Sequence, residues 1–372
     1  MSDLLAVLNR AEQLIRQGQD GLLATVVKTE GSAYRRAGAR LLVDRQGGRV
    51  GGISGGCLEG DILKKGWWRT ERGPTLVTYD STGTEETAWR SGGGCNGIVQ
   101  VLLQRISPSG DSALSFIRDC FDHGRTGILA TVFFADPQTS INCGDQAHFD
   151  KVKGWGARFE SHALNDCFQI DVAEQLKLKR SRTFTYSVAG GSVDIFSEVV
   201  QPPIQLAIFG GGFDVSPVVQ AARALGWSVA CIARRPQKGF DAEQVVVTPA
   251  KMACAHMRLN DRTAAVVMNH NFEEDRDAIA MLLGSDVRYI GILGPRDRTE
   301  QILAEVDASL ALDRIYAPIG LDVGAETPEE IAASIIGQII AVFSGHPGGH
   351  LRDRTGPIHL QEESCLMEEL CE

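Results

Sequence analysis

Two glycine-rich stretches of the chain each carry one cysteine. The first, from Gly51 to Asp61, reads GGISGGCLEGD and sets Cys57 among five glycines, and the second, from Ser91 to Gly97, reads SGGGCNG and carries Cys95. Glycine lets a backbone adopt positive φ and approach a ligand closely. Consecutive backbone N–H groups form anion-binding concavities, and a thiolate is a nucleophile and a metal ligand. The two stretches therefore predict one site that brings two thiols to an anionic ligand.

Charged residues near the first stretch are candidates for the same site. Arg35, Arg36 and Arg40 form a basic cluster, which either contacts a phosphate or pterin or is a solvated turn. Glu59 and Asp61 follow Cys57 directly. Such acids complement the dipole of a helix, and Glu59 alternatively holds the loop or orients an arginine.

Secondary-structure patterns place Cys57 at or just before the start of a helix over residues 58–68. The positive end of a helix dipole favours a thiolate over a thiol. The alternative interpretation of Cys57 is a small buried hydrophobic residue. Other predicted elements of this part are a helix over 2–17, strands over 22–28, 39–44, 49–53, 75–79 and 98–105, a helix over 114–122, and strands over 183–187 and 192–200.

An internal repeat links two of these segments. Residues 18–27 (GQDGLLATVV) match residues 124–133 (GRTGILATVF) at an offset of 106, and each copy follows a predicted helix. The match predicts two related α–β units in one N-terminal domain. Residues 136–181 are polar and show no regular pattern, and the second copy lacks a loop like that around Cys57.

A boundary at Gln201-Pro202-Pro203 precedes a second pattern. A buried strand over 204–209 runs into Gly210-Gly211-Gly212, and a helix and a strand over 228–233 follow. Strand, glycine turn and helix in this order are typical of a dinucleotide- or phosphate-binding unit. Ala233 stands where an NAD site usually has an acid, and Arg234 and Arg235 follow, which favours a ligand with an additional phosphate, such as NADP or a pterin phosphate.

Composition narrows the class of protein. The chain has 372 residues and a net charge of −10, which argues against a general nucleic-acid or anionic-membrane binder. Its nine cysteines include no CxxC pair, and no segment has the ~20 apolar residues of a membrane span. We therefore expect a cytoplasmic protein with reduced thiols. Of the cysteines outside the two glycine stretches, those of the acidic tail, Cys365 and Cys371, are expected to be exposed, and the others are expected to pack in the interior: Cys120, Cys143, Cys167, Cys231 and Cys254.

The predicted fold is α/β, with an N-terminal mixed α/β domain and a C-terminal Rossmann-like, doubly wound parallel sheet. The predicted domains are residues 1–200 and 204–345, followed by a flexible acidic tail over 346–372. In the second domain a long helix begins at Pro328 with Thr327 as its N-cap.

These motifs together resemble the XdhC/CoxI family. The resemblance rests on SGGCLE at 54–59, GCNG at 94–97, RAGAR at 36–40, GGG at 210–212, YIGILG at 289–294 and IGLDVG at 319–324, which runs into TPEEI. It covers nearly the whole chain apart from the tail. The sequence departs from the family at Ala233, where an Asp is usual, and at GCNG, where GCGG is usual.

The resemblance implies an accessory protein of molybdenum hydroxylases such as xanthine dehydrogenase, a chaperone rather than an enzyme. It would bind the molybdenum cofactor (molybdopterin), protect it while a cysteine desulfurase sulfurates it, and deliver it, as a homodimer. Cys57 and Cys95 are the candidate molybdenum contacts. The candidate cofactor-binding residues are Gly55, Gly56, Cys57, Glu59, Gly94, Cys95, Gly97, Arg36, Arg40, Gly210, Gly212 and Arg235. An NADP-dependent oxidoreductase and a thiol-based sulfur-transfer protein remain alternatives.

Overall fold

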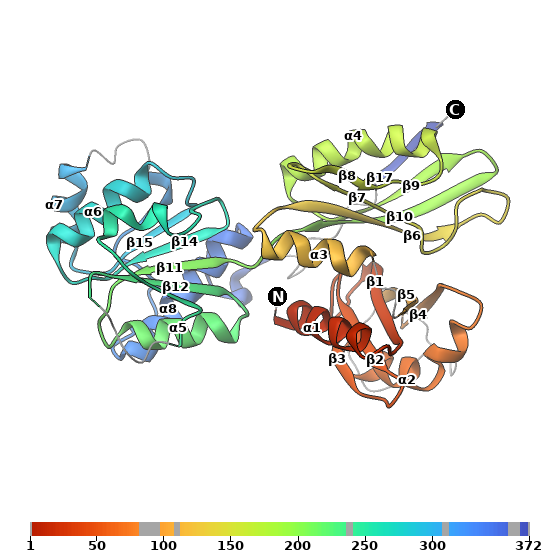
Figure 1. Cartoon of the computed structure of the whole chain (residues 1–372), viewed down its shortest axis with the longest axis horizontal. Coiled ribbons are helices and arrows are strands. Elements are labelled where there is room, and N and C mark those ends of the chain that lie inside the picture. Colours follow the sequence, from red (N-terminus) through yellow and green to blue (C-terminus); the bar gives the residue numbers. More distant parts are fainter. Residues whose placement is uncertain are drawn as a thin grey trace. The chain divides into compact units, whose positions relative to one another are not determined.

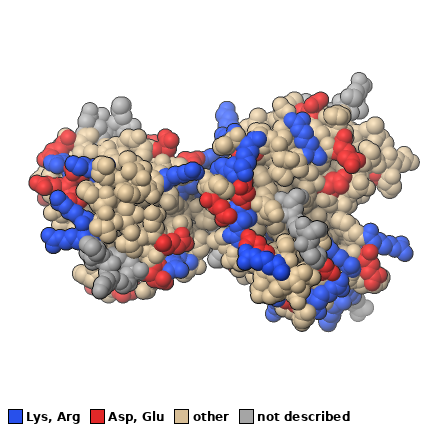
Figure 2. Space-filling view, in the orientation of Figure 1, with Lys and Arg blue, Asp and Glu red and all other residues tan. Residues whose placement is uncertain are grey.

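The chain folds into two compact units (Figure 1). The computed structural model describes residues 2–81, 97–107, 112–235, 241–306, 312–355 and 365–370. Asp3–Pro202 and the C-terminal strand make the N-terminal unit, and Pro203–Gly356 make the second unit. Among the described helices, none is long and apolar enough to cross a membrane. Basic and acidic side chains are interspersed over the visible face of both units (Figure 2).

The first half of the N-terminal unit is a five-stranded antiparallel sheet of order β3-β2-β1-β5-β4. Its elements are α1 (Ser2–Arg16), β1 (Gly21–Gly31), β2 (Arg40–Asp44), β3 (Arg49–Gly51), α2 (Cys57–Arg69), β4 (Thr75–Asp80) and β5 (Gly97–Ile106). β1 is central and buried on both faces, which explains its continuous apolar run.

The second half is a six-stranded sheet of order β17-β9-β10-β6-β7-β8. Its elements are α3 (Ser112–Asp122), β6 (Gly127–Ala135), β7 (Gln146–Asp150), β8 (Gly154–Ala157), α4 (His162–Leu178), β9 (Arg182–Val188), β10 (Gly191–Val200) and β17 (Cys365–Leu370). β17 pairs in parallel with β9 at the edge, whereas all other pairs are antiparallel.

The two halves repeat one topology, which confirms the internal repeat and extends it far beyond ten residues. Without β17, the second sheet has the order β8-β7-β6-β10-β9, and α4 lies between β8 and β9 as α2 lies between β3 and β4. Hydrogen bonds recur at the same offset of 106. Val26 N donates to Ala39 O and Val132 N to Asp145 O, both at 2.9 Å.

The helices form the layers of this unit (Figure 1). α1 and α3 pack together against one face of both sheets, with Leu23 of β1 and Leu129 of β6 in the same cluster. The opposite face of the first sheet is covered by α2, and that of the second sheet by α4. Each half thus supplies one helix to a shared core and one to its own outer face.

The second unit is a six-stranded, fully parallel sheet of order β13-β12-β11-β14-β15-β16. This is the doubly wound order 3-2-1-4-5-6, so we call it the Rossmann unit. Its elements are β11 (Gln205–Phe209), α5 (Val215–Ala224), β12 (Ser228–Ala233), β13 (Gln244–Val247), η1 (Ala250–Ala255), β14 (Thr263–Val267), α6 (Phe272–Leu283), β15 (Tyr289–Ile292), α7 (Arg296–Glu305), η3 (Leu312–Arg314), β16 (Ile315–Tyr316), α8 (Pro328–Ser344) and η4 (Leu351–Asp353).

Helices cover both faces of this sheet. α5 and α8 pack on one face, and η1, α6 and α7 pack on the other. α8 begins as predicted, because the Thr327 side chain accepts a hydrogen bond from Glu330 N and Pro328 occupies the first turn. The predicted α/β fold class, with a mixed N-terminal unit and a Rossmann-like second unit, is confirmed.

The structure differs from the sequence-based expectations in three places. Residues 136–181, whose sequence pattern is polar and less regular and in which no helix or strand was predicted, contain β7, β8 and the long helix α4. Cys365–Leu370, within the expected flexible tail, form β17, while residues 356–364 and 371–372 lie outside the described part. Cys167, expected only to pack, is disulfide-bonded, whereas Cys57, Cys120, Cys143, Cys231 and Cys254 are thiols.

Candidate functional site

The strand directions bring the predicted site segments to one end of the first sheet. Neighbouring strands are antiparallel, so the chain leaves β1, β3 and β4 and enters β2 and β5 at the same end. This end carries the cysteine loop (residues 52–56 and Cys57), the basic turn between β1 and β2, and both attachment points of residues 82–96. The sheet therefore gathers the segments that the sequence motifs indicate.

Glu59 holds the cysteine loop from beneath. Its side chain is 5% exposed, and one carboxylate oxygen accepts hydrogen bonds from Ile53 N at 2.9 Å and Ser54 N at 2.7 Å. The other oxygen accepts from Ser54 Oγ and, at 3.1 Å, from Gly56 N. The loop N–H groups expected to cradle an external anion are thus bound to an internal carboxylate. Of the alternatives for Glu59, the structure favours the residue that holds the loop.

The hydrogen bonds to Glu59 also determine its ionisation. Burial alone raises the pKa of a carboxyl group, but the donors of Ser54 and Ile53 outweigh it and hold the pKa of Glu59 below its ordinary value of 4.5. Glu59 is therefore a carboxylate at neutral pH, and the loop keeps its shape as long as that charge persists.

Cys57 is the first residue of α2 and is exposed. Gly56, at the N-cap, has φ 122°, a conformation that favours glycine. A Cβ placed on Gly55, Gly56 or Gly60 would meet no atom of the described residues within 4 Å. The alternative that Cys57 is a buried hydrophobic residue is wrong.

The internal repeat provides a comparison for this cysteine. In the second copy, Phe159 N donates to Asn165 Oδ1 at 3.0 Å, as Ile53 N donates to Glu59 in the first. One loop hydrogen bond is thus retained at the offset of 106, and the residue equivalent to Cys57 is Ala163. The helix starts differ by one position, because α4 begins at His162, whereas α2 begins at Cys57. A helix therefore forms at this place in the topology without a cysteine.

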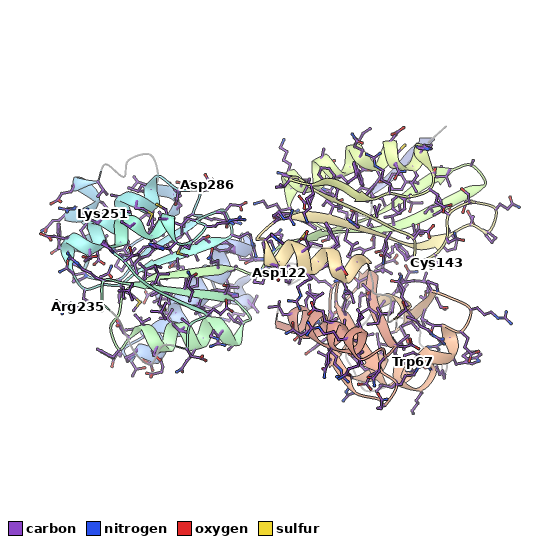
Figure 3. The ribbon with its side chains drawn as sticks, in the orientation of Figure 1. Trp67, Asp122, Cys143, Arg235, Lys251 and Asp286 are labelled. Carbon is purple, nitrogen blue, oxygen red and sulfur yellow. The ribbon has the colours of Figure 1, made fainter. Side chains whose placement is uncertain are left out.

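Asp61 fixes the helix that carries Cys57. Its side chain is 4% exposed and binds Arg69, Lys65 and, at 2.9 Å, the Tyr79 hydroxyl of β4. Burial opposes its charge, but the hydrogen bonds from Arg69 and Tyr79 keep the pKa of Asp61 low. On the same helix, Trp67 (Figure 3) lies 3.9 Å from the guanidinium of Arg45. The helix start is thus held rigidly against the sheet.

The two candidate arginines of the basic turn differ in position. Arg36 is exposed, whereas Arg40 is 6% exposed and forms a two-pronged ion pair with Glu198 of β10. Arg40 Nη1 also donates to Gly38 O at 3.0 Å. Arg40 therefore joins the two sheets of the N-terminal unit, and Arg36 is the one of the pair that faces solvent.

The second glycine stretch is described only at its end. Gly94 and Cys95 lie outside the described residues, and Gly97 is the first residue of β5. A Cβ on Gly97 would overlap the backbone of Glu30 and Ser32, so this position needs glycine for packing. Ser81 N donates to Gly97 O at 3.1 Å, so the two residues that flank positions 82–96 are adjacent in space.

In the Rossmann unit the glycine turn leads from β11 into α5. A Cβ on Gly210 would lie 2.6 Å from Met268 O, and a Cβ on Gly212 would overlap the carboxylate of Asp214. Arg235 lies at the surface of this unit just beyond β12 (Figure 3). Gly210 is thus needed where β11 and β14 approach each other, and Gly212 where Asp214 folds back over the turn.

The importance of Gly210 for packing is testable. We expect Gly210→Ala to lower the free energy of unfolding by about 2 kcal/mol, the usual cost of forcing an extra methyl group into a packed site. Urea denaturation followed by tryptophan fluorescence measures this loss. The matched control is Gly55→Ala, where the added methyl group meets no atom within 4 Å. An unchanged stability of the Gly210 variant would show that the turn can widen freely.

Sequence analysis missed a polar pair in this unit. His270 Nε2 lies 2.8 Å from Asp214 Oδ2, although 56 positions separate the two residues in the chain. Asp214 belongs to the glycine-turn motif, but His270 carries no spacing signal in the sequence that would distinguish it from a structural histidine. Among the described residues, no group of three or more His, Cys, Asp or Glu side chains is arranged to hold a metal ion.

Comparison with known families covers both units. The family model described as "XdhC and CoxI family" matches residues 14–80, and the one described as "XdhC Rossmann domain" matches residues 206–339. The chain belongs to the XdhC and CoxI family. The first match contains the whole cysteine loop, and the second contains the glycine turn, Asp214 and His270.

Similar proteins in this family extend over nearly the whole chain. The chain is 29% identical over 335 residues, 88% of this chain and 95% of the relative, to a probable xanthine dehydrogenase subunit of Bacillus subtilis. It is 20% identical over 369 residues to the "Molybdenum cofactor insertion chaperone PaoD" of Escherichia coli, covering 98% of this chain and 92% of that protein.

A solved structure shares the fold. The crystal structure of a xanthine dehydrogenase from Bacillus halodurans superposes with a TM-score of 0.71 at 27% sequence identity, covering 91% of this chain and 96% of that chain. The comparisons give no support to the NADP alternative.

Proposed function

We propose that this protein is an accessory factor that binds the molybdenum cofactor and delivers it to a molybdenum hydroxylase of the xanthine dehydrogenase class. The names of its relatives support this role: one is a molybdenum cofactor insertion chaperone, and another is a probable component of a xanthine dehydrogenase. In this proposal a cysteine desulfurase sulfurates the cofactor while the protein protects it, and the protein acts in the cytoplasm as a homodimer.

Cys57 is the observation that carries the proposal. It is an exposed thiol at a helix start, in a loop that Glu59 holds from within. Thiolates are the protein ligands that suit soft metal centres. The equivalent position in the second copy is Ala163 of α4, so a helix at this place in the topology forms without a cysteine. Cys95 is proposed as a second contact and Arg36 as a phosphate contact.

Anaerobic binding of purified molybdenum cofactor tests this role. We expect stoichiometric binding by the wild type, measured by co-elution and molybdenum analysis, and at least about tenfold weaker binding by Cys57→Ala, equivalent to about 1.4 kcal/mol or more. The control is Cys254→Ala, which removes an exposed cysteine of the Rossmann unit. Equal binding by the two variants would remove Cys57 from the site, and no binding by the wild type would overturn the proposed function.

Of the two alternatives, an oxidoreductase is disfavoured by the glycine turn. The carboxylate of Asp214 lies at the start of α5, where a dinucleotide would place its pyrophosphate, and like charges repel. A sulfur-transfer protein predicts instead that a persulfide forms on Cys57 in the absence of any pterin. Mass spectrometry of the protein after incubation with a cysteine desulfurase and cysteine distinguishes this alternative.

A further inference from the structure

The Rossmann unit has its topological switch point between β11 and β14. These strands are neighbours at the centre of the sheet. After β11 the chain turns to α5 on one face, and after β14 it turns to α6 on the other face. In open parallel sheets, the crevice outside the carboxyl ends of two such strands is where ligands bind.

The pair formed by Asp214 and His270 spans this switch point. Asp214 follows β11 as the N-cap residue of α5, and His270 follows β14. The Asp214 side chain is 14% exposed, whereas that of His270 is 55% exposed and open to a ligand. The carboxylate is thus held inside the turn, and the imidazole is held at the surface of the crevice.

His270 is mounted on a rigid loop in a costly backbone conformation. Its φ is 56°, a left-handed value that non-glycine residues seldom adopt. Three contacts fix the residues around it: Asn269 Nδ2 donates to Asp275 Oδ1 at 3.0 Å, Arg298 binds the other oxygen of Asp275, and the Asn271 side chain caps α6. Backbone strain that the surroundings enforce in this way clusters at functional sites.

The hydrogen bond to Asp214 determines what His270 offers. A carboxylate only accepts hydrogen bonds, so Nε2 of the imidazole carries the proton. In the neutral ring, Nδ1 then has a free lone pair and accepts hydrogen bonds. The remaining oxygen of Asp214 is buried and has no hydrogen-bond partner among the described residues, and it adds negative charge where a phosphate would otherwise bind. The crevice is therefore built for a hydrogen-bond donor.

The glycine turn also carries an exposed aromatic side chain. Phe213 lies in the same turn, between Gly212 and Asp214, and is 84% exposed. Aromatic faces stack on planar rings. A hydrogen-bond acceptor and an exposed aromatic ring that follow neighbouring strands at the same edge of the sheet suit a planar heterocycle with ring N–H groups.

We propose that His270 is a ligand-contacting residue of this crevice and that Asp214 is its positioning residue, so that Nδ1 accepts a hydrogen bond from an N–H group of a pterin. The pterin identity rests on the proposed function, since pterin is the heterocycle of the molybdenum cofactor. The polar pair, the strained loop and the exposed phenylalanine carry the contact itself.

Two isosteric variants of His270 in the full chain separate a binding role from a structural one. Asn places its polar atom near the position of Nδ1 and tolerates a left-handed backbone, whereas Gln reaches the position of Nε2 and keeps the bond to Asp214. We expect His270→Gln to weaken the binding of free pterin, followed by quenching of its fluorescence, about tenfold. His270→Asn should retain most of the affinity. The reverse order would show that His270 only braces the turn.

The role of Asp214 has its own signature. In ¹⁵N-histidine-labelled protein, we expect the His270 Nδ1 resonance of the wild type in the range of an unprotonated nitrogen and a mixed tautomer in Asp214→Asn. If the hydrogen bond to Asp214 only braced the turn, the tautomer would change in this variant while the affinity for pterin stayed the same. Unchanged tautomer and affinity in that variant would overturn the assignment of Asp214.

A further measurement distinguishes a failure of this inference from a failure of the proposed function. Free pterin lacks the molybdenum that Cys57 is proposed to contact, so the measurement with free pterin tests His270 separately from the proposed role of Cys57. If the wild type binds no pterin, or if NADP displaces pterin and its binding depends on His270, the inference is overturned whatever the outcome for Cys57.

Discussion

Replacing Arg40 with alanine is expected to lower the free energy of unfolding by about 3 to 5 kcal/mol, the usual cost of leaving one member of a buried ion pair alone. Arg40 is 6% exposed, and its partner Glu198 lies on the other sheet of the N-terminal unit. Removing the guanidinium leaves a carboxylate that is 12% exposed without its counter-charge. Urea denaturation at neutral pH measures the loss, and Arg36→Ala, at an exposed position, should change stability by less than about 0.5 kcal/mol.

The internal repeat supplies a rescue for this variant. Gly38 lies against Glu198 as Gly144 lies against Gln104, so Gln104 and Gln146 occupy the positions equivalent to Glu198 and Arg40. Of these four polar residues, all except Glu198 line the same small cavity. The double variant Arg40→Gln with Glu198→Gln copies this neutral arrangement and should recover most of the lost stability. A double variant as unstable as Arg40→Ala would show that the charge pair itself is needed.

Local signals explain how much of the fold the sequence predicted. The start of α2 follows from glycines before Cys57 and acids after it, and the start of α8 from Thr327 and Pro328, because caps depend on neighbouring residues alone. The doubly wound sheet follows from alternating strands and helices. The repeat was visible only over ten residues, yet its strands and hydrogen bonds are equivalent over most of both halves.

Helix α4 shows why other parts could not be predicted. Its buried face includes Asn165, Asp171 and Gln175, each at most 4% exposed, so polar residues interrupt the hydrophobic periodicity. These side chains are satisfied by partners far along the chain, such as Ser197 for Gln175 and Tyr186 for Asp171. A periodicity rule has no means of recognising a polar residue that becomes buried only after such a partner is in place.

For the candidate site, the sequence predicted which segments take part but not which contacts they make. The motif located the cysteine loop, but it did not show that the loop N–H groups bind Glu59, because an internal carboxylate and an external anion satisfy the same donors. Likewise, the glycine turn was recognised, while the contact between Asp214 and His270 depends on the adjacency of β11 and β14. Arg40 matched a family motif and resides in the interior.

Replacing Glu59 with alanine is expected to destabilise the N-terminal unit by about 4 kcal/mol and to disorder the loop around Cys57. The donors of Ile53 and Ser54 lose their acceptor, whereas Gly56 N keeps its bond to Ser54 Oγ. An unsatisfied buried donor costs about 1 to 3 kcal/mol before water reaches it. Urea denaturation measures the stability, and the rate at which a thiol reagent modifies Cys57 reports on the loop. Asn165→Ala, the equivalent change in the second copy, should reduce stability without altering that rate.

The pH dependence of stability shows whether the charge of the Glu59 side chain or only its shape stabilises the loop. Because its folded-state pKa lies below the ordinary 4.5, its contribution to stability is complete above that value and is lost as the pH falls through the folded-state pKa. Glu59→Gln keeps the shape but turns an amide donor toward the donors of Ser54 and Gly56, so it should be less stable than the wild type at pH 7. The difference should shrink as the pH falls through the lowered folded-state pKa of Glu59, where the wild type becomes protonated as well. A difference that persists unchanged in acid would show that the carboxylate charge does not hold the loop, and the loop around Cys57 would then owe its shape to the glycine backbone alone.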